Sequence, residues 1–177
     1  MRQTVFCILF VTAASVANAQ HDMSGPRPTS PGNAAFGTIS EIVRMLDADP
    51  KTDWSKVNIE ALRQHLIDMD LVLMTSTVKQ RNVAGGVELD VTGTGPTVAA
   101  IRRMAVNHTR MLDGAQYRAS AADIAGGAKL TIAAKNHGDS AAVARIRGLG
   151  FAGLFTEGDH HAMHHLMLAK GQAVHSP

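Results

Sequence analysis

The chain has 177 residues, a formal net charge of +2 and an aromatic content of only 4%. It contains no basic block and few rings that could stack on bases, which argues against nucleic acid as a partner. The length is sufficient for one domain with a buried core.

The first residues have the pattern of a secretory signal peptide. Arg2 precedes an apolar run, residues 5–16, that is too short for a membrane span, and Ala-Asn-Ala at 17–19 matches a cleavage site. We expect residues 1–19 to be removed, leaving a soluble periplasmic or secreted protein without a stable membrane anchor. The only cysteine, Cys7, would leave with them, so a metal site in the mature chain must use His, Met, carboxylate or backbone ligands.

Residues 20–37 are predicted to be a flexible leader, because they are rich in Pro, Ser and Gly. Cleavage after Gln20 instead of Ala19 would make His21 the N-terminal residue. Its amine and imidazole could then chelate copper together, which is an alternative to a leader without a binding role.

Two helices are predicted to follow the leader. A capping box formed by Thr38 and Glu41 begins the first helix, and Pro50 ends it. Asn58 is the expected N-cap of the second helix, residues 59–70.

The rest of the chain contains an internal duplication. Residues 124–132 (IAGGAKLTI) resemble residues 83–91 (VAGGVELDV), and a helical pattern follows each copy. We interpret this as two strand–strand–helix units, at about 71–113 and 115–170. One unit cannot bury its apolar face alone, so the two copies should share one sheet.

The predicted fold class is α+β. A single domain, residues 38–171, would contain the two N-terminal helices and a four-stranded, mainly antiparallel sheet with helices packed on one face. Alternation of side chains predicts that the first strand begins at Leu71. Residues 172–177 would form a loose tail.

The helix of the second unit should be interrupted. Gly148, Gly150 and Gly153 fall within it, and glycine lowers helix stability, so a bend or break is expected. Asp159 is a candidate N-cap for a short final helix, and Gly171 fits the C′ position that ends it.

The final helix would carry four histidines within six residues. His160 with His164, and His161 with His165, form two i, i+4 pairs, a spacing that lets two imidazoles reach one ion from one helix face. Residues 160 and 165 point too far apart for all four to bind one ion, so one pair is favoured. The alternative is a solvent-facing helix end that binds metals only opportunistically.

Two more histidines, His65 and His108, lie on the apolar stripes of predicted helices. The bend in the second unit could turn the final helix towards them. Mixed His and Met ligation suits copper, histidines alone suit zinc, nickel or cupric copper, and non-covalent haem is a further alternative. The simpler interpretation is hydrogen-bonded core histidines and gap-filling methionines. The methionines considered as additional ligands are Met69, Met104, Met111 and Met163.

No catalytic residue is predicted, because the chain has neither a nucleophile elbow nor a His-Glu-x-x-His motif. Glu157 or Asp159 could act as a base beside a metal-bound water, which keeps a metal-dependent hydrolase as an alternative. The glycine-containing turn at 92–97 lacks the dinucleotide and P-loop fingerprints. We interpret it as a strand-to-helix turn and predict no anion site.

Two stretches, residues 63–69 (RQHLIDM) and 158–166 (GDHHAMHHL), resemble small exported bacterial proteins that are sometimes labelled aspartate carbamoyltransferase. The resemblance covers most of the mature chain, and that group has no established biochemistry to carry over. The chain is too short for the two-domain carbamoyltransferase fold and lacks its Ser-Thr-Arg-Thr loop and His-Pro motif. We therefore do not expect that activity.

The leading hypothesis is a soluble periplasmic copper-binding protein that acts in metal storage, delivery or tolerance. Its predicted partner is the metal ion, and the sequence specifies no protein partner. The main alternative is a periplasmic α+β binding or interaction module whose histidines are structural or respond to pH.

Overall fold

The computed structural model describes residues 33–114, 116–157 and 161–172. The predicted signal peptide, most of the leader, Asp159, His160 and residues 173–177 lie outside these ranges. None of the described helices is long and apolar enough to cross a membrane. In chain order the elements are α1 (Ala34–Ala48), α2 (Ile59–Thr75), β1 (Thr77–Val83), β2 (Gly86–Thr92), α3 (Pro96–Leu112), β3 (Tyr117–Ile124), β4 (Gly127–Ala134), α4 (Ser140–Phe155) and α5 (His161–Ala169).

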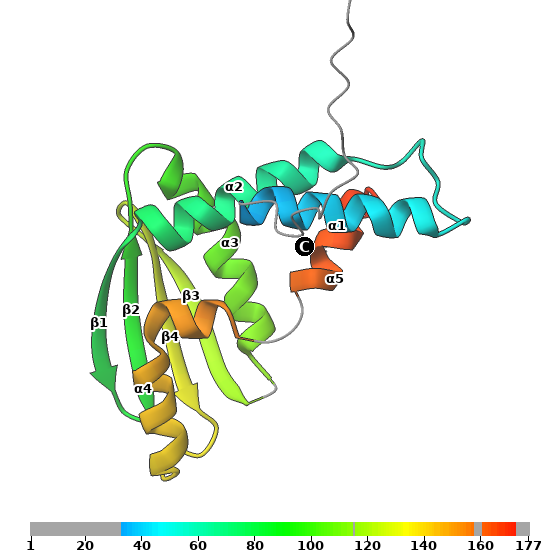
Figure 1. Ribbon diagram of the computed structural model, residues 1–177. Coiled ribbons are helices and arrows are strands. Elements are labelled where there is room, and N and C mark those ends of the chain that lie inside the picture. Colours follow the sequence, from blue (N-terminus) through cyan, green and yellow to red (C-terminus); the bar gives the residue numbers. More distant parts are fainter. Residues whose placement is uncertain (1–32, 115, 158–160, 173–177) are drawn as a thin grey trace, which may run out of the picture.

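The strands form one antiparallel sheet in the order β1-β2-β4-β3, which confirms the predicted α+β class. Two helices precede the first strand, as expected. Helices α3 and α4 pack against the sheet (Figure 1), and the main core lies between them and the strands. Inward side chains of β2 and β4, such as Leu89 and Ile132, are almost completely buried there.

The pairing of β2 with β4 has the symmetry expected of a duplication. Leu89 pairs with Leu130, its own counterpart in the other unit. The pair Gly86 and Ala133 is repeated by the pair Gly127 and Thr92. A pseudo-twofold axis therefore passes through the middle of the sheet, and the two units share it.

The same symmetry explains two glycines at the start of the inner strands. A Cβ atom at Gly86 would lie 2.0 Å from the backbone oxygen of Ile132, and a Cβ at Gly127 would lie 2.0 Å from that of Val91. Backbone cannot move aside as a flexible side chain can. Only glycine therefore allows the two central strands to approach each other at these points.

The first strand does not begin at Leu71, contrary to the prediction. Helix α2 continues to Thr75, and β1 begins at Thr77. The Thr75 hydroxyl donates to the backbone oxygen of Leu71 at 2.6 Å, the i−4 bond of a helical threonine. Val72 is fully buried in the main core. The packing of α2 against α3 therefore overrides the local alternation of apolar and polar residues.

Helix α1 begins at Ala34, four residues before the predicted capping box. The side chain of Asn33 accepts a hydrogen bond from the backbone N–H of Phe36 at 3.2 Å, so Asn33 is the N-cap. Residues 34–37, which were assigned to the leader, are therefore helical.

The interruption predicted in the second unit is present at Gly150. Its backbone angles, φ 56° and ψ −160°, are not helical and divide α4 into two parts. The predicted end of α5 is also confirmed. Gly171 has φ 70°, and its N–H donates to the backbone oxygen of Leu168 while Gln172 donates to that of Met167, which is a Schellman motif.

A second, smaller core fixes α5 against α1 and α2. The N–H of Asn58 donates to the backbone oxygen of Ala169 at 2.8 Å, and Lys170 forms an ion pair with Asp49 at 3.2 Å. The hydrogen bond joins the start of α2 to the end of α5, and the ion pair joins the end of α1 to it. The buried members of this core are Ile42, Leu46, Leu62, Leu66 and Ala169.

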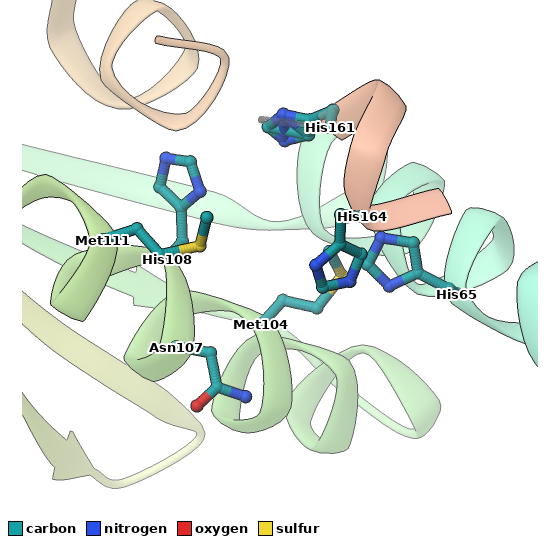
Figure 2. Close-up of a pocket in the computed structure, with 7 residues that line it drawn as sticks. All are labelled: His65, Met104, Asn107, His108, Met111, His161 and His164. Carbon is teal, nitrogen blue, oxygen red and sulfur yellow. The ribbon is translucent and has the colours of Figure 1, made fainter. Parts of the chain in front are cut away.

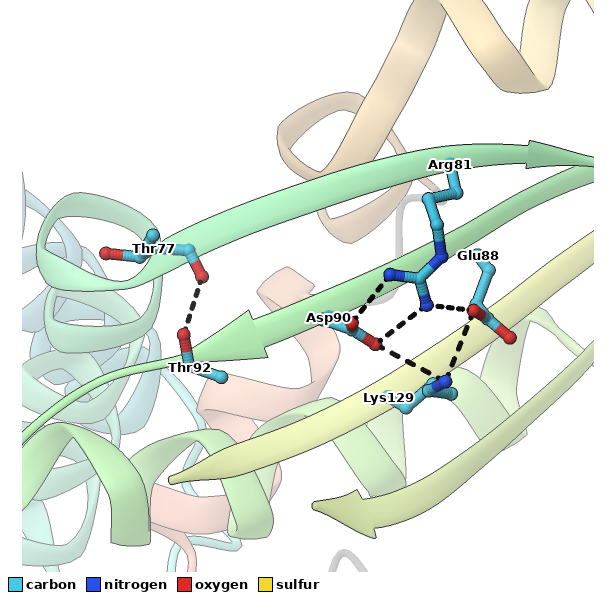
Figure 3. A network of polar contacts seen from close by, with 6 residues as sticks. All are labelled: Thr77, Arg81, Glu88, Asp90, Thr92 and Lys129. Carbon is cyan, nitrogen blue, oxygen red and sulfur yellow. Dashed lines mark hydrogen bonds and ion pairs between the residues drawn. The ribbon is translucent and has the colours of Figure 1, made fainter. Parts of the chain in front are cut away.

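Charged side chains of alternating sign cover part of the sheet (Figure 3). Arg81 pairs with Glu88 and with Asp90, the latter at 2.9 Å, and Lys129 lies 3.2 Å from Glu88. These pairs link β1, β2 and β4. They are partly exposed, so each contributes little to stability.

We expect Gly127→Ala to lower the free energy of unfolding by about 2 kcal/mol or more, because its methyl group would collide with the backbone oxygen of Val91. Gly148→Ala is the matched control. Gly148 lies inside α4, and a Cβ there meets nothing within 4 Å, so the change should stabilise by about 0.5–1 kcal/mol. Urea denaturation measures both. Similar effects of the two substitutions would contradict the close approach of β2 and β4.

Candidate metal centre

Three helices bring together the histidines that the sequence singled out. Helix α2 supplies His65, α3 supplies His108, and α5 supplies His161, His164 and His165. Figure 2 shows four of them around one cavity, which is lined by His65, Met104, Asn107, His108, Met111, His161 and His164. The structure thus places α5 beside α2 and α3.

Three of these imidazoles surround a common point. The ring centre of His65 lies 4.6 Å from that of His164 and 5.4 Å from that of His165, and the last two are 6.4 Å apart. Rings that bind one ion through nitrogens at about 2.0–2.1 Å have centres roughly 5–6 Å apart. The separations of His65, His164 and His165, called the histidine triangle below, lie within, just below and just above that range, so the three rings are near the spacing of shared ligands.

The three ring centres of the histidine triangle are arranged at distances compatible with one shared ion. A point equidistant from the three ring centres lies about 3.3 Å from each, close to the roughly 3.2 Å expected between a bound metal and a ring centre. Within the described ranges, no three His, Cys, Asp or Glu side chains are already arranged to hold an ion. Binding therefore requires the rings to turn about χ2, a broad torsion in histidine.

His165 is the most unusual member of the histidine triangle. Its side chain is only 7% exposed, and its Nε2 atom has no hydrogen-bond partner among the described residues. Burial, aided by the nearby His161, lowers the pKa of His165. The ring is therefore neutral at physiological pH and keeps a lone pair, as metal binding requires.

His65 is also held neutral. Burial, together with the nearby histidines of α5, lowers its pKa to about 3, whereas Asp68 opposes the shift. Asp68 cannot neutralise the cluster, because it is committed to Arg103 of α3 in two hydrogen bonds of 2.9 and 3.0 Å. This pair, in which Asp68 is buried and Arg103 is exposed, instead ties α2 to α3 beside the cavity.

His108 has a defined tautomer. Its Nε2 atom lies 3.0 Å from the backbone oxygen of Leu154, which can only accept, so Nε2 carries the proton and Nδ1 the lone pair in the neutral ring. The ring also packs on Phe155, with centres 4.6 Å apart. A backbone carbonyl orients metal-binding histidines in this way, but it equally satisfies a core histidine.

The structure separates the predicted methionines into two groups. Met104 and Met111 line the cavity with the histidines. Met163 is 58% exposed, and Met69 packs against the smaller core, so neither lines this cavity. His160 lies outside the described residues.

Sequence reasoning missed Asn107, which also lines the cavity. Its amide donates to the backbone oxygen of Arg103 at 2.8 Å. The only feature of the sequence that could have indicated Asn107 is its position next to His108. Glu157, considered as a catalytic base, accepts from Tyr117 at 2.7 Å and pairs with Arg145 at 2.7 Å. These bonds give the Glu157 carboxylate a structural role that joins α4 to β3.

The cavity volume, about 30 Å³, is that of one water molecule or one small ion. Sites for organic ligands are typically about 300–1,000 Å³. The volume therefore favours a single ion over haem or an organic substrate.

Comparison with known protein families, with curated proteins and with solved structures finds no match to this chain. The resemblance to small exported bacterial proteins stays a prediction.

We expect the metal-free protein to lose stability as pH falls from about 6.5 towards 3. Unfolded His65 titrates near its ordinary pKa of 6.5 and folded His65 near 3, so between these values the unfolded state binds more protons. At pH 5 this one residue accounts for a loss of about 1–2 kcal/mol. Urea denaturation with a chelator at pH 7.5 and pH 5 measures the difference.

His65→Gln should reduce this pH dependence, and His137→Gln should not, because His137 is exposed in the loop before α4. An unchanged pH dependence in His65→Gln would show that other groups cause the acid sensitivity.

Proposed function

We propose that this protein binds one copper ion through the imidazoles of His65, His164 and His165. The observation that carries the proposal is that their ring centres surround a point at ligating distance. Burial lowers the pKa of both His65 and His165, which keeps their rings neutral. The neutral rings support binding without prior loss of protons.

The ligand set favours copper over zinc. Three imidazoles alone suit zinc as well as cupric copper, so the preference for copper rests on the sulfur atoms nearby. The only cysteine, Cys7, lies in the predicted signal peptide. The thioethers of Met104 and Met111 line the cavity beside His65 and His164, and soft sulfur ligands select Cu(I).

The proposed role is copper storage, delivery or tolerance in the periplasm. Residues 1–19, interpreted as a signal peptide, support export. The cavity has room for one ion and none for a substrate, and Glu157 is engaged by Tyr117 and Arg145. These features support binding of a metal over metal-dependent hydrolysis.

One observation favours the alternative of structural histidines. His108 is buried, bonded to the backbone of Leu154 and packed on Phe155, as a core histidine would be. His165 distinguishes the two functions. A structural histidine has a bonded ring, whereas the Nε2 atom of His165 has no such partner among the described residues.

Competition against chelators of known affinity, with Cu(I), Cu(II) and Zn(II), tests the proposal. We expect His165→Leu to weaken copper binding by about 100-fold, because one of three ligands is lost. The same substitution should leave the metal-free unfolding free energy equal or higher, because it removes an unpaired buried polar atom.

His137→Ala is the matched control and should change neither quantity, because this histidine is exposed. A copper affinity no better than that of a surface histidine pair, or one unchanged by His165→Leu, would refute the proposal. A large loss of stability in His165→Leu would assign the residue a structural role instead.

A further inference from the structure

The cavity has a second wall, opposite the histidine triangle. In Figure 2, His65 and His164 lie on one side of the cavity and His108 and Met111 of α3 on the other, and the Met104 side chain extends from α3 towards His164. The three α3 residues follow one another at spacings of four and three. They therefore lie on one stripe of the helix, facing α5.

His108 and His161 have the spacing of shared ligands. Their ring centres are 5.7 Å apart, within the range for two imidazoles on one ion. The backbone oxygen of Leu154 holds the Nε2 proton of His108, so the Nδ1 lone pair is the donor that this ring would offer.

The two thioethers differ in their access to solvent. Met111 is 42% exposed, whereas Met104 is partly buried against the main core. The stripe therefore leads from the surface to the interior of the cavity. In the sequence, His108 lies between the two methionines. Thioethers bind Cu(I) well and zinc poorly.

We propose that His108, His161, Met104 and Met111 form a second position for copper, the entry position, which accepts Cu(I) and passes it to the histidine triangle. This inference rests on the proposed function. Two imidazoles and two thioethers suit Cu(I), and the 30 Å³ cavity accommodates one ion at a time.

Transfer proceeds by ligand exchange without a change of oxidation state. His164 belongs to the triangle and also lines the cavity, and the ring centre of His161 lies 6.4 Å from that of His165. A copper–nitrogen bond to the triangle forms as a copper–sulfur bond of the entry position breaks. The copper stays Cu(I), and because neutral imidazoles replace neutral thioethers, no proton is released.

The first test removes sulfur without removing volume. The double variant Met104→Leu, Met111→Leu should slow Cu(I) uptake from a chromogenic Cu(I) chelator by about tenfold or more and leave Zn(II) affinity within about twofold, because Leu conserves the packing volume of Met. Met163→Leu is the matched control. Met163 is 58% exposed on α5 and does not line the cavity.

The second test looks for sulfur bound to copper. In the variant His65→Gln, His165→Leu, which lacks two triangle ligands, Cu(I) should stay bound at the entry position. X-ray absorption should then show sulfur scattering at about 2.3 Å, as for other metal–sulfur bonds. Adding Met104→Leu and Met111→Leu should remove that scattering.

The outcomes separate the two proposals. If the wild-type protein binds no copper tightly, the proposed function fails. If it binds copper through His165, but the methionine variant takes up Cu(I) at the wild-type rate, only the entry position is refuted. The uptake experiment decides this even if the histidine variant does not fold.

Discussion

The apolar contact between α5 and α2 is the constraint on which the site depends. Helix α5 has only nine residues, too few to be stable alone in water, so its orientation comes from what it packs against. Ala169 is fully buried in the smaller core with Leu62 and Leu66 of α2. That contact fixes the end of α5, and one turn earlier it brings His164 and His165 against His65.

The same contact makes the unoccupied histidine triangle energetically costly. Three imidazoles are gathered where water cannot solvate their charged forms, so the site favours neutral rings. The Nε2 atom of His165 gains no hydrogen bond from the described residues in return for its burial. A ligand that bound these nitrogens in the folded state alone would recover that loss and stabilise the fold. Metal binding and α5 docking would then reinforce each other.

Sequence signals that act within a few residues were sufficient to predict most of the fold. Gly171 ends α5 as predicted, because a left-handed C′ position is a local property. The alternation of apolar and polar residues at 71–75 predicts a strand but is also compatible with a helix. Only the packing of α2 on α3 decides between them. For the site, the i, i+4 spacing relates residues of a single helix only. It therefore does not predict that a second helix, α2, brings His65 close to both His164 and His165. It also does not predict that Met163 faces solvent.

The register between β2 and β4 has a consequence for the origin of this chain. Leu89 faces its own counterpart, Leu130, so each inner strand pairs with a copy of itself. Two separate copies of a single ancestral unit could therefore have formed the same four-stranded sheet as a symmetric dimer. After fusion of the two genes, the sequences of the two copies could have diverged from each other. The final helix could then be acquired by one copy alone, which would make the histidine cluster a product of broken symmetry.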